Sequence, residues 1–190
     1  ILSYVQLLLF TSNSEISIIF RENASMKSSN YDWSQFTKRI GIKTTTDKIF
    51  ERWTTRAGLE SWFLAMAEFK DKNGEVRGDR EKVEIGDSFT WMWLIADEVG
   101  KGTVLEMVPG KSISFTFLGC HVKVSIYEEA GESIAEVVQS GIPTDDTSKY
   151  KIFLDCTEGW TFYLSNLKAV LESGVDLRNR NEKLKRVINT

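Results

Sequence analysis

Alternating apolar and polar side chains predict a series of β-strands along most of the chain. The alternation is clearest over residues 111–118, where Ile113, Phe115 and Phe117 share one face and hydroxyl-bearing residues occupy the other. Similar segments follow one another across short turns, a pattern typical of an antiparallel meander. The predicted strands cover residues 33–43, 87–95, 100–108, 111–118, 120–127 and 132–139, with a further short apolar segment at 67–70.

A spacing of three or four residues between apolar side chains replaces this alternation in two regions. Threonines followed by an aspartate are typical helix N-caps, and they predict a short helix over residues 47–54. Gly58 then separates it from a second short helix, predicted over residues 59–63. Near the end of the chain, an apolar stripe predicts a long helix over residues 147–172, with Gly174 as its stop.

These elements predict a single α+β domain with two layers. Two short helices are too small to form a core alone, and the long helix needs a broad concave partner for its apolar stripe. The aromatic face of the meander supplies that partner. We therefore expect a curved antiparallel sheet that wraps around the long C-terminal helix, with an apolar pocket between them.

Composition and charge exclude several function classes. The 190 residues are 42% hydrophobic, which is ordinary for a globular domain, and the net charge of −3 is too small to indicate a nucleic acid or an acidic membrane as partner. The single histidine, His121, excludes a two-histidine metal site within one chain. We therefore expect no metal and no cofactor.

The two cysteines, Cys120 and Cys156, form no C-x-x-C motif. They are typical of free buried thiols in a reducing compartment, so we predict a cytoplasmic protein. A Cys120–Cys156 disulfide is the alternative.

Both ends of the chain depart from the pattern of the domain. Residues 1–25 contain two apolar runs that are too short to span a membrane, and we interpret them as an N-terminal extension before a start at Met26. An extra element packed on the domain is the alternative. The domain is expected to cover residues 26–174. Residues 175–190 carry five basic and two acidic side chains and predict a solvated basic tail, with a phosphate- or partner-binding arm as the alternative.

Five short motifs occur in an order that resembles a known superfamily. They lie at residues 46–53, 59–63, 102–109 (G-x-V-x-E-x-x-P), 140–143 (SGIP) and 159–168. Together they resemble the START-like or Bet v 1-like SRPBCC superfamily, in particular the bacterial branch related to the activator of the heat-shock-protein-90 ATPase. The resemblance covers about residues 33–173. It implies a helix-grip fold with a hydrophobic cavity between the sheet and the long helix.

The implied cavity selects a set of candidate ligand-binding residues, mostly aromatic. Trp91, Phe117 and Trp160 are expected to form its wall, and Gln139 and Tyr163 are candidate polar contacts. Ordinary core packing is the alternative for each of them, because aromatic side chains dominate cores as well as pockets. The full set is Trp62, Trp91, Trp93, Phe115, Phe117, Gln139, Trp160, Tyr163 and Leu167.

Three functions are compatible with these residues. The first is binding of a small apolar molecule in the cavity, without covalent chemistry. The second is a protein-interaction or stress-response module that acts on a partner such as a chaperone, as the family name implies. The third is an enzyme of the cyclase or hydrolase kind, for which Gln139, Tyr163 and Glu106 are the candidate polar groups. We expect a binding protein rather than an enzyme.

Overall fold

The domain begins with the first strand and contains every helix and strand described below. The computed structural model describes residues 31–94, 99–181 and 183–184. The chain divides into two units, Ile1–Asp32 and Trp33–Thr190, and the described elements belong to the second. The predicted start at Met26 and the apolar runs before it lie outside the described residues.

Seven strands form one antiparallel sheet in the order β1-β7-β6-β5-β4-β3-β2. The predicted meander is confirmed, and the first strand completes the sheet by pairing with the last. The strands are β1 (Gln35–Ile42), β2 (Met66–Lys70), β3 (Ser88–Met92), β4 (Val99–Val108), β5 (Ser112–Phe117), β6 (Cys120–Glu129) and β7 (Glu132–Ser140).

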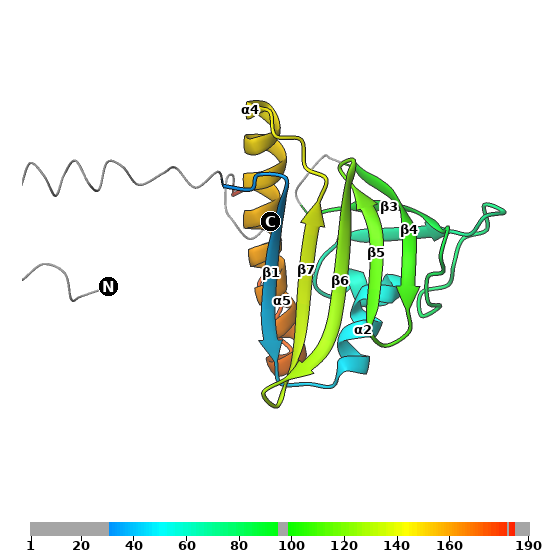
Figure 1. Ribbon diagram of the computed structural model, residues 1–190. Helices are drawn as coiled ribbons and strands as arrows, with labels where there is room; N and C mark the ends of the chain where they lie inside the picture. Colours follow the sequence, from blue (N-terminus) through cyan, green and yellow to red (C-terminus); the bar gives the residue numbers. More distant parts are fainter. Residues whose placement is uncertain (1–30, 95–98, 182, 185–190) are drawn as a thin grey trace, which may run out of the picture. The chain divides into compact units, whose positions relative to one another are not determined.

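The sheet curves around helices on its concave face, as the helix-grip prediction requires. Figure 1 shows the long helix α5 lying against β1, while α2 lies near β5 and β6. No described helix is long and apolar enough to cross a membrane. The helical segments are α2 (Thr46–Thr54), α3 (Arg56–Glu60), α4 (Asp146–Ser148), the π-helix η1 (Lys149–Leu154) and α5 (Asp155–Ser173).

The predicted helix over residues 59–63 was wrong in its position, since α3 spans Arg56–Glu60. Thr55 caps this helix, because its hydroxyl accepts a hydrogen bond of 3.0 Å from the backbone N–H of Gly58. Gly58 therefore lies inside the helix instead of before it. A Cβ at this position would lie 2.5 Å from the carbonyl oxygen of Glu51, so glycine allows the two short helices to meet closely.

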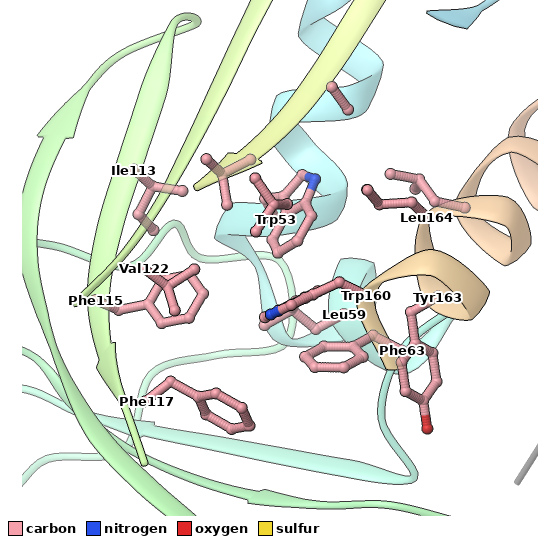
Figure 2. Packing of buried hydrophobic residues seen from close by; sticks show 14 of the residues in the cluster. Trp53, Leu59, Phe63, Ile113, Phe115, Phe117, Val122, Trp160, Tyr163 and Leu164 are labelled. Atoms are coloured by element: carbon pink, nitrogen blue, oxygen red, sulfur yellow. The ribbon is translucent and has the colours of Figure 1, made fainter. Parts of the chain in front are cut away.

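The core is unusually rich in aromatic contacts. Trp53, Trp62 and Trp91 are among the largest fully buried side chains. The rings of Trp53 and Trp62 meet edge to face with centroids 4.8 Å apart, and such pairs contribute about 0.5–1.5 kcal/mol beyond their buried area. The described core is therefore continuous from the short helices to the sheet, as Figure 2 shows around Trp53.

Both ends of the long helical segment are capped, and Gly174 ends it as predicted. The carboxylate of Asp145 accepts hydrogen bonds from the hydroxyl and the backbone N–H of Ser148, which hold the pKa of Asp145 below its usual value. At the other end Gly174 adopts φ 68°, the left-handed conformation that favours glycine, and its N–H donates to the carbonyl of Val170 at 3.0 Å. The chain then turns back toward the domain.

Candidate functional site

An apolar cavity lies between α5 and the strands β4 and β5. Its volume is about 240 Å³, larger than the cavities of about 150 Å³ that hold benzene in an engineered protein core. The cavity opens to solvent between Val99 and Leu118, whose side chains are about half exposed, and beside the exposed Lys151 and Asp155. It is lined by Phe63, Trp93, Val99, Gly100, Phe117, Leu118, Lys151, Asp155, Cys156, Gly159, Trp160 and Tyr163.

Aromatic rings from three parts of the chain form the wall of this cavity. Phe63 follows α3, Phe117 ends β5, and Trp160 and Tyr163 project from α5. The Phe63 ring centroid lies 5.3 Å from that of Trp160 and 4.8 Å from that of Tyr163, and Phe117 lies 6.1 Å from Trp160. Figure 2 shows these four rings facing one another at one end of the core. Such a wall offers large apolar faces to a ligand with rings of its own.

The helical wall of the cavity contains a glycine. A Cβ placed on Gly159 would meet nothing within 4 Å, so the backbone of α5 borders open space at this point. Glycine inside a helix costs about 0.8–1.0 kcal/mol relative to alanine. No packing contact offsets that cost here, so Gly159 leaves the cavity wider at the expense of helix stability.

A π-helical turn lies next to the cavity mouth. Segment η1 immediately precedes α5 and carries Lys151, and π-helical turns occur frequently at functional sites. The wider turn keeps Phe153 buried against Phe36 while Lys151 stays at the mouth. Within the described part of the chain, no ion pair involves Lys151.

Behind the wall, a buried glutamine holds the largest ring in place. Gln139 is 0% exposed, and its Oε1 accepts a hydrogen bond of 2.9 Å from the indole N–H of Trp160. Its Nε2 has no hydrogen-bond partner among the described residues. The indole of Trp160 is therefore fixed from behind, with its ring facing the cavity.

The thiol and the phenol that line the cavity are both neutral near pH 7. Burial raises the pKa of Cys156 to about 11. Burial likewise raises the pKa of Tyr163 to about 12, against the opposing charge of Arg178. Both cysteines are free and buried, and the described residues hold no cluster of three or more His, Cys, Asp or Glu side chains suited to a metal ion. The cavity thus presents neutral surface, with charge only at its mouth.

The nine residues predicted from the sequence fall into two groups. Trp93, Phe117, Trp160 and Tyr163 line the cavity, and the structure brings them together. The other five are buried behind the wall, in the core itself; they are Trp62, Trp91, Phe115, Gln139 and Leu167.

Gln139 is therefore placed to orient Trp160, and it is not among the residues that line the cavity. Glu106, considered as a polar group for an enzyme, is exposed instead. Gly159 was not predicted to line the cavity. A glycine within the apolar stripe of a helix could have indicated it.

Comparison with protein families identifies the family to which the chain is similar. The family model described as "Activator of Hsp90 ATPase homolog 1-like protein" matches residues 43–172, well over half of the chain. No curated protein sequence shows significant similarity to this chain.

Solved structures share the fold at low sequence identity. Protein SSP2350 from Staphylococcus saprophyticus is 19% identical with a TM-score of 0.60, and the match covers 76% of this chain and 96% of that one. The Aha1 dimer from Colwellia psychrerythraea is 19% identical with a TM-score of 0.57, covering 74% and 97%. DynU16, a protein of the dynemicin biosynthetic locus, is 16% identical with a TM-score of 0.60, covering 77% of this chain and 50% of its own.

Proposed function

This chain belongs to the Activator of Hsp90 ATPase homolog 1-like family, and we propose that it is a binding protein for one small, flat, apolar molecule held in the cavity beside α5. The observation that carries the proposal is the open space at Gly159. Aromatic rings surround a cavity that the helix leaves unfilled, although a side chain at this position would fit and would favour the helix.

The lining favours a ligand with rings and at most one charged group. Phe63, Phe117 and Trp160 offer ring faces, and the bare backbone at Gly159 admits a flat surface. Desolvation of the ligand contributes about 25 cal/mol per Å² of apolar area, less the cost of ordering. An acidic group on the ligand would reach Lys151 at the mouth. No step of covalent chemistry is part of this proposal.

A second candidate is interaction with a protein partner, such as the chaperone that the family name mentions. The half-exposed Val99 and Leu118 at the mouth favour it, because apolar side chains gathered on a surface are typical of contact sites. The two free buried thiols support the prediction of a reducing, cytoplasmic location for either function.

Thermal unfolding of the full chain tests the first proposal. Fatty acids, sterols, flavonoids and aromatic acids are added in turn, and unfolding is followed by tryptophan fluorescence. A ligand present at 100 times its Kd stabilises the native state by about 2.7 kcal/mol. For a chain of this size we therefore expect the melting temperature to rise by about 5–10 °C with flavonoids or aromatic acids. A flat response across the whole panel from folded protein would contradict the proposal and favour the protein partner.

A further inference from the structure

The segment after α5 does not extend into solvent as the basic composition of the tail predicted. Residues 174–178, here called the C-terminal strap, fold back onto the turn that follows α3. Arg178 is only 6% exposed, although it was counted among the basic residues of a solvated tail. The expectation of a solvated side chain is therefore wrong for Arg178, and a buried arginine needs specific partners.

Arg178 binds two backbone carbonyls at once. Its Nη1 donates to the carbonyl of Leu64 at 2.8 Å, and its Nη2 donates to the carbonyl of Glu60 at 3.0 Å. The carboxylate of Asp176 accepts from Nε at 2.9 Å and from Nη2 at 2.8 Å, which neutralises the buried charge. Only a planar guanidinium supplies several donors in this fixed geometry.

Asn166 of α5 completes the attachment from the other side. It is fully buried, and its Nδ2 donates to the carbonyl of Trp62 at 2.6 Å. Its Oδ1 accepts from the backbone N–H of Leu177 in the strap at 2.7 Å, and its Nδ2 also approaches Asp176 at 3.1 Å. One polar network therefore joins α5, the strap and the turn after α3.

The carbonyls held by this network lie on either side of a cavity residue. Glu60, Trp62 and Leu64 bracket Phe63, whose ring lies within 6 Å of the ring centroids of Trp160 and Tyr163. The network therefore binds the backbone on both sides of Phe63. The strap also lies beyond residues 43–172, the part that matches the family model.

We propose that the C-terminal strap positions Phe63 and so fixes the width of the ligand cavity, with Arg178 as the main positioning residue. The inference rests on the proposed binding function for its consequence, but its structural part does not depend on any ligand. A wall held in place before binding loses less conformational freedom when a ligand arrives, so the strap strengthens binding through preorganisation.

Amide hydrogen exchange of the ligand-free protein tests the structural part. The N–H groups of Phe63 and Leu64 donate to the carbonyl of Leu59 at 2.9 and 3.1 Å, and they report on the turn directly. In Arg178→Ala we expect exchange over residues 60–66 to be about tenfold faster through local opening. Exchange over residues 122–138 in β6 and β7 reports global unfolding and should rise much less.

Two further variants make this test specific. Arg180→Ala is the matched control, because Arg180 also pairs with Asp176 at 3.2 Å but its side chain is 69% exposed and reaches neither carbonyl of the turn. Amide exchange over residues 60–66 in Arg180→Ala should be as slow as in the wild-type protein. Arg178→Lys keeps the charge but has a single nitrogen in place of the two that bind the carbonyls, and it serves if Arg178→Ala fails to fold. We expect it to show most of the increase in local exchange.

Binding of anilinonaphthalene sulfonate, a fluorescent probe with aromatic rings and an acidic group, tests the consequence. We expect Arg178→Ala or Arg178→Lys to raise the Kd of the probe about tenfold while Arg180→Ala leaves it unchanged. If exchange over residues 60–66 is unchanged in both Arg178 variants, the strap does not position Phe63 and the inference falls. Faster exchange with unchanged probe affinity would also overturn it. If wild-type protein binds no probe, the proposed function fails, and the exchange experiment still decides whether the strap holds the turn.

Discussion

Replacing Trp160 with alanine is expected to lower the free energy of unfolding by about 3–5 kcal/mol, the range for truncating a large buried aromatic side chain. Trp160 packs against Trp53, Phe63 and Phe117, so its loss leaves a void next to the existing cavity. The loss also removes the hydrogen bond to Gln139, and a buried amide oxygen without a partner costs a further 1–3 kcal/mol or so. Urea denaturation of the two proteins measures the difference.

A double-mutant cycle separates the hydrogen bond from the packing. Trp160→Phe keeps a ring but leaves the Oε1 of Gln139 without its donor, so we expect about 1–3 kcal/mol of destabilisation. Gln139→Met removes the buried amide, whose Nε2 is already unpaired. The double variant should be more stable than the sum of the single changes predicts, by about 1 kcal/mol. Strict additivity would show that the 2.9 Å bond does not hold the ring.

Replacing Gly159 with leucine is expected to raise the Kd of anilinonaphthalene sulfonate about 100-fold without destabilising the protein. The leucine side chain enters the open space in front of α5 and occupies part of a cavity of about 240 Å³. A 100-fold loss corresponds to about 2.7 kcal/mol of binding free energy. The helix itself should gain up to about 1 kcal/mol, because leucine is a far better helix former than glycine.

Two companion variants show whether the effect comes from the cavity. Gly159→Ala adds a single methyl group, so it should stabilise the helix to a similar extent. It should reduce the affinity for the probe much less than leucine does. Glu158→Leu places the same side chain at the neighbouring exposed position of α5 and should leave probe affinity unchanged. Unfolding of Gly159→Leu at lower urea than wild type would show that the space is not open. Equal probe affinity in both leucine variants would move the binding site elsewhere.

Most of the fold was predictable because its elements have strong local periodicity. The alternation in β5 places Ile113 and Phe115 in the core, as the sequence indicated. The position of α3 was not predictable in this way. A glycine is typical of a helix end, so Gly58 was expected to separate the two short helices. It lies inside α3 instead, where the carbonyl oxygen of Glu51 leaves no room for a side chain.

The site was less predictable, because the residues that line a cavity and the core residues behind it are of the same types. Trp91 and Trp93 are two residues apart on the same face, but Trp91 is fully buried in the core whereas Trp93 borders the cavity. Arg178 was misjudged for a different reason. Its partners, the carbonyls of Glu60 and Leu64, lie over one hundred positions away in the sequence, and no local sequence pattern predicts such a contact.

The most direct test of the central claim follows the indole N–H signals of the six tryptophans in a two-dimensional 1H–15N spectrum during titration with anilinonaphthalene sulfonate. Single Trp→Phe variants assign the signals. Binding in the cavity beside α5 predicts large saturable shifts for Trp93 and Trp160, which line it, and small ones for Trp33, which does not. Saturable binding that leaves the Trp93 and Trp160 signals in place, or no saturable binding at all, would contradict the account.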